Sequence, residues 1–217
     1  MKKLLTALLF ALPLGSYAQP SSQVAWTPEL LKQLQNASPE QGKTLSQTCQ
    51  GCHGETGISS VLNTPILAGQ LRTYLYKQIM DYAQGNRSHP LMNAIASQVS
   101  ADQAGHIAAW FATQAPSASS TKGQADLSLA QKLVVDGDSQ RAIAPCEVCH
   151  GSEGEGAKIA VPAIAGQQAD YIRANLTAFR TGERHNDIYS PMRHIAATLT
   201  DEEIKQLGAY YQSMSRD

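Results

Sequence analysis

Hydrophobic residues recur with helical spacing in both halves of the chain. Over residues 71–82 and again over 171–179, apolar side chains return every three or four positions, which predicts an amphipathic helix in each segment. Gly85 and Gly182 follow these segments as predicted helix ends. The apolar faces consist of Leu71, Tyr74, Leu75, Ile79 and Tyr82 in the first helix and of Tyr171, Ile172, Leu176 and Phe179 in the second. Strand-like alternation is nearly absent, so the predicted fold class is all-α.

Each half also carries the start signal of one further helix. Ser100 with Gln103, and Thr200 with Glu203, have the spacing of capping boxes. The predicted buried faces of these last helices are Ala104, Ile107 and Phe111 in the first half and Ile204, Leu207, Tyr211 and Met214 in the second. The two halves therefore share the same order of helical signals.

The second half repeats the first at an offset of 97 positions. Residues 65–70 and 162–167 both read Pro-x-x-Ala-Gly-Gln. The second copy then gains three residues, so Met92 and Met192 lie 100 positions apart. The repeat predicts two structurally equivalent helical domains.

The predicted domains occupy residues 38–113 and 124–217, with a linker of small residues at 114–123. The first domain should open on a helix capped by Ser38, with a capping-box glutamine at Gln41. Residues 19–37 precede it as a leader. Four apolar residues of this leader have the spacing of a short amphipathic helix: Trp26, Leu30, Leu31 and Leu34.

The N-terminus has the pattern of a secretory signal peptide at residues 1–18. Lys2 and Lys3 precede a short apolar run, and Ala18 marks the predicted cleavage site, so we expect a periplasmic protein. The chain has 42% hydrophobic residues and a net charge of −1, which becomes about −3 without Lys2 and Lys3. This mildly acidic balance gives no indication of nucleic-acid binding.

All four cysteines belong to two Cys-x-x-Cys-His pentapeptides, at 49–53 and 146–150. This is the attachment signature of haem c, in which two thiols bind the haem and the histidine becomes an axial iron ligand. The signature assigns two covalent haem c groups to Cys49 and Cys52 and to Cys146 and Cys149. A four-thiolate zinc site is an alternative interpretation, but it leaves the histidine after each pair unexplained. Paired disulfides or thioredoxin-like redox pairs are further alternatives, but a redox pair normally lies in a strand-rich fold, and strand signals are nearly absent here.

The proximal ligands are then His53 and His150, and Met92 and Met192 are the predicted sixth ligands. These methionines follow the first cysteine of their motifs by 43 and 46 residues, in proline-marked loops before the last helices. His89 and His194 are alternative sixth ligands beside them. Four further residues have other predicted roles, namely packing for Met80 and Met214 and a place on the surface for His106 and His185.

The repeated loops at 65–70 and 162–167 suggest contacts around these sites. We hypothesise that a backbone carbonyl at Pro65 or Pro162 accepts the second ring N–H of the proximal histidine, which orients the imidazole and raises its basicity. Gly69 and Gly166 would allow close backbone approach to the haem, or form simple turns. Four residues are candidates for contact with the haem or its propionates, or for a solvated or packing role: Tyr74, Tyr171, Arg87 and Arg184.

Together these motifs resemble class I cytochrome c domains in tandem. Cys-x-x-Cys-His-Gly at 49–54 and 146–151, the Pro-x-x-Ala-Gly-Gln segments, the two methionines and the C-terminal helix pattern carry the resemblance. The arrangement is similar to that of periplasmic dihaem cytochromes of the c-four type, over nearly all of 38–217. The resemblance implies two His/Met haems, with His53 and Met92 on one iron and His150 and Met192 on the other. It also implies domains related by a pseudo-twofold axis and electron delivery to terminal oxidases.

Two features depart from the repeat. Residues 136–139 insert a loop before the second motif, and the leader at 19–37 could dock to a dedicated partner. The sequence favours an electron carrier without intrinsic enzyme activity. The expected redox partners are a membrane oxidase, a bc-type complex or a periplasmic dehydrogenase, and the expected contact with membrane complexes is peripheral. A dedicated haem subunit of a sulfur-compound or alcohol dehydrogenase is the alternative, and a haem enzyme in its own right is the third hypothesis.

Overall fold

A computed structural model describes residues 21–116, 126–157 and 159–216. Within these ranges the chain is helical, and its extended structure is limited to two isolated bridges, Asp138 with Ile143 and Ala157 with Val161. The all-α prediction is confirmed. The proposed signal peptide and most of the proposed linker lie outside the described residues.

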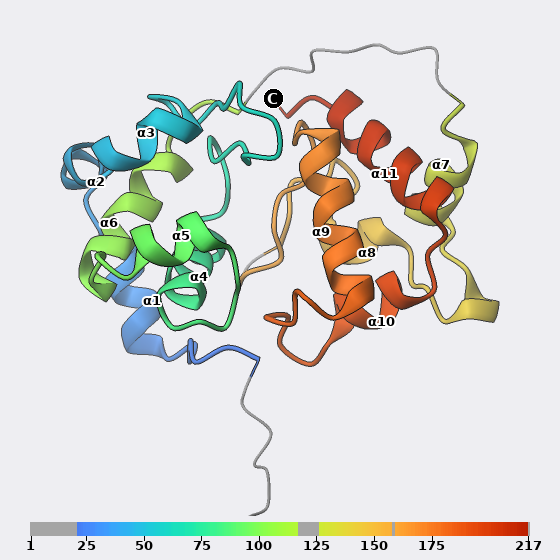
Figure 1. Cartoon of the computed structure of the whole chain (residues 1–217), viewed down its shortest axis with the longest axis horizontal. Coiled ribbons are helices and arrows are strands. Elements are labelled where there is room, and N and C mark those ends of the chain that lie inside the picture. The colour runs from blue at the N-terminus through green and yellow to red at the C-terminus, as the bar shows by residue number, and fades with distance from the viewer. Residues whose placement is uncertain (1–20, 117–125, 158, 217) are drawn as a thin grey trace, which may run out of the picture.

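The helices form two lobes, which Figure 1 shows side by side. The first lobe contains α1 (Pro28–Gln35), α2 (Pro39–Leu45), α3 (Gln47–His53), α4 (Arg72–Ala83), α5 (Pro90–Ala96) and α6 (Ala101–Ala112). The second contains α7 (Ser128–Val135), the 3-10 turn η1 (Ser139–Arg141), α8 (Cys146–His150), α9 (Ala169–Thr181), α10 (Pro191–Ala197) and α11 (Asp201–Ser213).

Most of the predicted helix starts and ends are present in the structure. Both capping boxes form, with the Ser100 and Thr200 hydroxyls accepting from the N3 backbone N–H groups. The helices α4 and α9 end beside Gly85 and Gly182, which have φ of 76° and 78°, where a side chain would be strained. At Ser38 the prediction was incomplete, because His106 Nδ1, rather than Gln41, accepts the Ser38 N–H at 2.9 Å.

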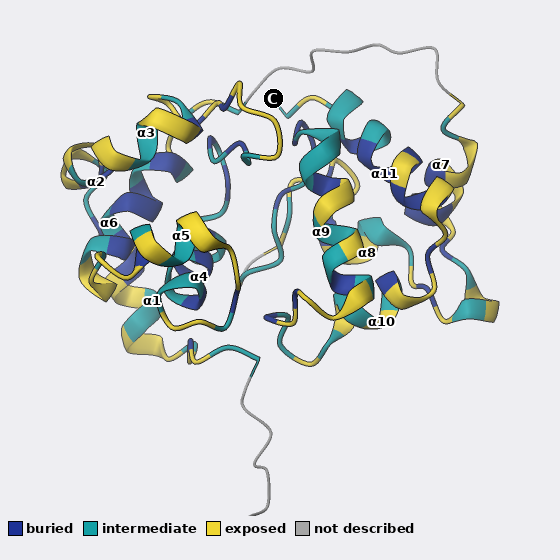
Figure 2. Ribbon diagram, viewed as in Figure 1, coloured by how far each residue is buried: buried dark blue, intermediate teal, exposed yellow. Residues whose placement is uncertain are grey.

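Each lobe has its own hydrophobic core, visible as the dark inner faces in Figure 2. The first core gathers around α6, where Ile107 and Phe111 are buried with Leu75 of α4. The second gathers around α11 in the same way. The predicted packing role of Met80 and Met214 is confirmed, because each is partly buried against the core of its own lobe.

The leader belongs to the first lobe. Val24 and Leu34 are buried in the first core, with Trp26 and Leu30 packed beside them. Ser22 donates to Asp81 Oδ1 at 2.6 Å, which ties the start of the described chain to α4. The amphipathic helix predicted for the leader is therefore present as α1, with its apolar face against the core.

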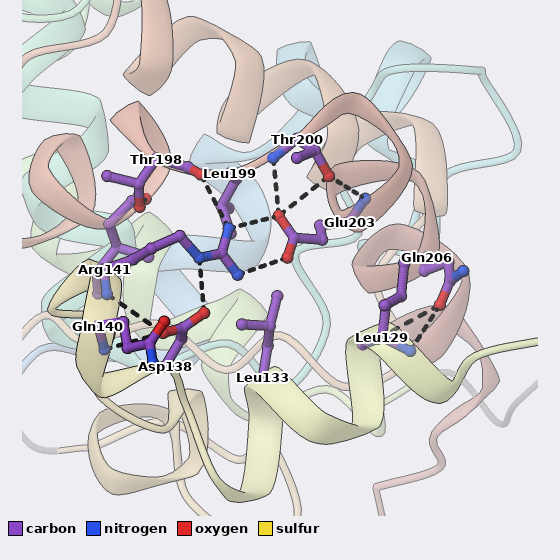
Figure 3. A network of polar contacts seen from close by, with 12 residues as sticks. Leu129, Leu133, Asp138, Gln140, Arg141, Thr198, Leu199, Thr200, Glu203 and Gln206 are labelled. Carbon is purple, nitrogen blue, oxygen red and sulfur yellow. Dashed lines mark hydrogen bonds and ion pairs between the residues drawn. The ribbon is translucent and has the colours of Figure 1, made fainter.

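The inserted loop of the second lobe is held by ionic contacts (Figure 3). Arg141 donates to Asp138 Oδ2 at 2.7 Å and to the two carboxylate oxygens of Glu203 at 2.6 and 3.0 Å. The same Glu203 carboxylate also receives the Thr200 N–H in the capping box of α11. One buried carboxylate thus joins the loop before the second Cys-x-x-Cys-His motif to the start of the last helix.

The lobes meet through a buried polar interface. Arg87 donates to Tyr171 and Asn175 of the other lobe at 3.0 and 2.8 Å. In the opposite direction, Arg184 of the second lobe donates to Tyr74 of the first at 3.0 Å and to Gln78 at 3.2 Å. Lys77 donates to the Asn186 carbonyl, and the Asn186 side chain donates to Asp81. Arg216 donates to the Gly69 and Ala68 carbonyls. Gln168 donates to the Ser59 carbonyl.

Candidate haem-binding sites

Each Cys-x-x-Cys-His motif forms one short helix, α3 in the first lobe and α8 in the second. Three residues span nearly one helical turn, so the two thiols of each pair lie on one side of their helix. None of the four cysteines is paired in a disulfide. Burial raises the pKa of the Cys49 and Cys146 thiols. Among the described residues, no group of three or more histidine, cysteine, aspartate or glutamate side chains could hold a metal ion, so the two cysteine pairs do not come together as a four-thiolate zinc site.

A glycine directly after each histidine ends the motif helix. Gly54 and Gly151 have φ of 82° and 83°, a conformation that other residues rarely adopt. A Cβ at position 54 would also come within 2.3 Å of the Ile58 carbonyl oxygen. Glycine at this position therefore lets the chain turn away immediately and leaves the histidine at the end of its helix.

Both proximal histidines are buried and bound to the repeated proline loops. His53 Nδ1 lies 2.9 Å from the Pro65 carbonyl oxygen, and His150 Nδ1 lies 2.9 Å from that of Pro162. A carbonyl oxygen only accepts, so Nδ1 carries the proton and Nε2 keeps its lone pair. The hypothesis that these carbonyls accept the second ring N–H is confirmed.

The electrostatic environment keeps these imidazoles neutral. Burial lowers the pKa of His53, and the bond to Pro65 only partly opposes that effect. The pKa of His150 is lowered by burial in the same way. At neutral pH both side chains are therefore neutral, with a free Nε2, which is the form that binds a metal ion.

The predicted methionine ligands lie on short helices rather than in loops. Met92 is in the first turn of α5 and Met192 in the first turn of α10, and both are half-buried. Proline at the first position of each helix explains the difference, since its fixed φ suits a helix start. Each lobe thus contains its own cysteine pair, histidine and methionine.

The residue after each methionine anchors its helix, a role that the sequence analysis missed. Asn93 donates to the Tyr82 and Arg87 carbonyls at 2.7 and 2.9 Å. Arg193 donates to Asp187 Oδ1 at 2.6 Å. Different side chains use different partners in the two repeats, so comparing the repeats could not have identified this anchor.

The other histidines have structural contacts. His89 caps α5 by accepting the Met92 N–H at 3.3 Å, and its side chain is exposed. His194 is exposed, with Nδ1 2.9 Å from the Ser190 carbonyl oxygen. His185 is exposed as predicted, whereas the surface prediction for His106 was wrong because its side chain is only 15% exposed and caps α2.

The two repeated arginines are buried cations without a carboxylate partner among the described residues. Arg87 and Arg184 are 6% and 9% exposed; their guanidinium groups donate to hydroxyl and amide oxygens and lie over the rings of Tyr82 and Phe179. Burial favours a higher pKa for Tyr74, but the positive charges of Arg184 and Arg87 lower it overall. Buried charges require counter-charges. This pair therefore fits acidic groups such as haem propionates.

Comparisons with known proteins agree with this geometry. Residues 137–215 match the model of the family described as Cytochrome c. The chain is 36% identical over 188 residues to cytochrome c4 from Thiocapsa roseopersicina, covering 84% of this chain and 95% of that protein. This chain belongs to the cytochrome c4 family. Its two Cys-x-x-Cys pairs fit two covalently bound haem c groups, and it is an electron-transfer cytochrome.

Two further similarities extend the comparison. A crystal structure of reduced cytochrome c4 from Pseudomonas stutzeri superposes with a TM-score of 0.76 at 33% identity, covering 82% of this chain and 99% of that one. The chain is also 33% identical over 174 residues to the thiosulfate dehydrogenase electron acceptor of Stutzerimonas stutzeri, covering 79% of this chain and 81% of that protein. Within the described ranges, none of the helices combines the length and apolarity that a membrane span requires.

Proposed function

We propose that this cytochrome c4 is a periplasmic carrier of single electrons with one redox centre in each lobe. The observation that carries the proposal is the pair of buried histidines, each fixed through Nδ1 to its proline carbonyl with Nε2 free. Haem c supplies reversible one-electron chemistry when it is bound. The chain positions the two sites through a polar interface that is largely buried.

In this proposal each lobe supplies a complete ligand set. Cys49 and Cys52 would attach one haem, and His53 with Met92 would hold its iron. Cys146 and Cys149 would attach the other haem, and His150 with Met192 would hold its iron. Arg87 and Arg184 receive the propionates, because both are buried cations that lack a carboxylate partner in the described chain. Because a histidine and a methionine side chain would hold each iron, the proposed role is electron transfer without intrinsic catalysis.

The proposed partners are redox proteins. A membrane oxidase or a bc-type complex would make the chain a mobile carrier, in peripheral contact with membrane complexes and directed to the periplasm by residues 1–18. The alternative is a dedicated electron-transfer subunit of a periplasmic dehydrogenase, which the similarity to a thiosulfate dehydrogenase electron acceptor supports. Purification of the native protein separates the two, because only a subunit should be recovered with a dehydrogenase at a fixed stoichiometry.

The first test is the visible spectrum of purified exported protein, oxidised and reduced, with the haem counted per chain and carbon monoxide added. We expect two low-spin haems, the weak far-red absorption of ferric methionine ligation and no reaction with carbon monoxide. A high-spin component or prompt carbon monoxide binding would reveal an open iron position. That result would contradict the carrier proposal and favour a haem enzyme.

A further inference from the structure

The peptide group that holds each proximal histidine is itself bound by the opposite lobe. In the first lobe, the Pro65 carbonyl binds His53 Nδ1, and the N–H of the same peptide belongs to Ile66. This N–H donates to Gln167 Oε1 at 2.9 Å. Gln167 lies just before α9 in the second lobe, so a side chain of one lobe contacts the peptide that orients the histidine of the other.

The second lobe contains the corresponding contact. The Pro162 carbonyl binds His150 Nδ1, and the N–H of that peptide, on Ala163, donates to Gln70 Oε1 at 2.9 Å. Gln70 lies just before α4 in the first lobe. The two contacts exchange roles between the lobes, as a pseudo-twofold relation requires.

Both glutamine amides are firmly oriented. Gln70 Nε2 donates to the Ala163 carbonyl at 2.8 Å, and Gln167 Nε2 donates to the Ile66 carbonyl at 2.9 Å. Each Oε1 also accepts the next N–H of its own chain, from Leu71 or Gln168. The side chains are only 5% and 7% exposed. Because each amide faces both a backbone donor and a backbone acceptor, a flipped amide would lose these bonds.

We propose that Gln70 and Gln167 are positioning residues that tune the proximal histidine of the opposite lobe. The inference rests on the proposed ligation by His53 and His150. A peptide N–H and C=O share one conjugated system, so a hydrogen bond to the N–H polarises the carbonyl and strengthens the bond that it accepts. A stronger bond from Nδ1–H makes the imidazole a more basic ligand, which stabilises oxidised iron.

The proposal predicts a crossed pattern of effects. Loss of Gln70 should weaken the His150 Nδ1–H bond and favour reduction of the second-lobe haem, while loss of Gln167 should do the same for His53 and the first-lobe haem. We expect the ratio of reduced to oxidised haem at fixed potential to rise roughly two- to fivefold. This ratio corresponds to about 20 to 40 mV at about 59 mV per tenfold change.

The experiment measures the Nδ1–H proton resonances of the two histidines in the reduced, full-length holoprotein. ¹⁵N-histidine labelling identifies the signals, and contacts to Pro65 or Pro162 assign them. Gln70→Leu should move the His150 signal upfield and leave the His53 signal in place. Gln167→Leu should do the reverse. Redox titration of both variants should show a raised potential in the haem of the opposite lobe.

Two further variants separate tuning from loss of lobe contact. Gln168→Leu removes another bond between the lobes, to the Ser59 carbonyl at 2.9 Å, but not one to a histidine-binding peptide. It should leave both histidine signals unchanged. Gln70→Glu, measured at pH 8, keeps an oxygen acceptor for the Ala163 N–H. Its His150 signal should therefore lie at or downfield of the wild-type position. This variant still tests the proposal if Gln70→Leu fails to fold.

Three outcomes would overturn the inference. They are shifts in the histidine of the same lobe, equal shifts in both histidines, and no shift of the opposite-lobe histidine in Gln70→Leu or Gln167→Leu. The proposed function has a separate criterion. If wild type shows two low-spin haems but the crossed pattern is absent, the tuning role alone fails. If wild type shows an open iron, the carrier proposal fails whatever the glutamines do.

Discussion

At the scale of single residues, a few polar atoms decide what the sites can do. A buried histidine without a partner would be free to rotate or to bind through either ring nitrogen. The carbonyls of Pro65 and Pro162 remove this freedom by taking the Nδ1–H of His53 and His150. The remaining lone pair, on Nε2, is the one that each imidazole can offer to a metal ion.

The methionine assignment predicts the effect of a single substitution. Met192→Ala should lower the reduction potential of one haem by on the order of 0.1 V, because a thioether ligand favours ferrous iron and axial ligands span a range of about 0.8 V. The other haem should change little. A redox titration followed by visible absorbance measures both potentials.

Met214→Ala is the matched control for this substitution. Met214 is partly buried against the second core and has the same side chain, so its loss should alter stability rather than potential. An unchanged titration of Met192→Ala would show that the sixth ligand of the second lobe has been misassigned.

At the scale of elements, the start of α11 depends on one carboxylate. The Arg141 hydrogen bond is the main reason that the pKa of Glu203 is lowered from 4.5. A lowered folded-state pKa means that the ionised form stabilises the fold. This contribution is fully present above about pH 4.5 and is lost as the pH falls through the lower folded value.

Glu203→Gln should therefore destabilise the protein by about 1.5 to 3 kcal/mol at pH 7, the range for hydrogen bonds to charged groups. The difference from wild type should shrink steadily below pH 4.5. Chemical denaturation of the holoprotein across this pH range measures it. Glu202→Gln, at an exposed neighbour that accepts from Lys205 and Gln206, should have an effect near zero. Equal effects from the two substitutions would contradict the role assigned to Glu203.

At the scale of the whole molecule, α4 lies between the first core and the second lobe, so that polar residues of this helix are buried and need partners within the protein. Lys77 and Asp81 are 4% and 0% exposed, and Asp81 accepts from Lys77, Ser22 and Asn186. One carboxylate thus links the leader, α4 and the second lobe. Its partner Lys77 has a pKa lowered mainly by burial, which Asp81 opposes.

Asp81→Ala should cost about 3 to 5 kcal/mol, because it leaves a buried lysine without a counter-charge. Denaturation at neutral pH measures the change. Ser22→Ala removes one hydrogen bond from the same carboxylate and should cost only about 1 kcal/mol. A small effect of Asp81→Ala would indicate that Lys77 reaches solvent or loses its charge at little cost.

The haem-free chain should fold poorly. Each predicted domain has fewer than 100 residues, which limits how much apolar surface the polypeptide can bury alone. The haem groups would supply much of the missing core. Circular dichroism with thermal melting of haem-free protein checks this expectation, and a cooperative native-like transition would refute it.

The sequence alone determined the local features of this protein. Helical periodicity, capping boxes and the glycine helix ends depend on neighbouring residues, and the structure has them at Ser100, Thr200, Gly85 and Gly182. The Cys-x-x-Cys-His motifs and the internal repeat are local as well. They were enough to indicate two haem groups and the cytochrome family.

Only the tertiary structure decided what happens between distant segments. The pattern of α4 gives no reason to bury Lys77, and nothing near Gln70 in sequence points to a peptide 93 residues away. From the sequence, contact with haem and packing were equally good predictions for Arg87 and Tyr171. The structure shows that Arg87 donates to the Tyr171 hydroxyl across the interface between the lobes. Such contacts depend on how two folded surfaces meet, and local sequence patterns do not encode that geometry.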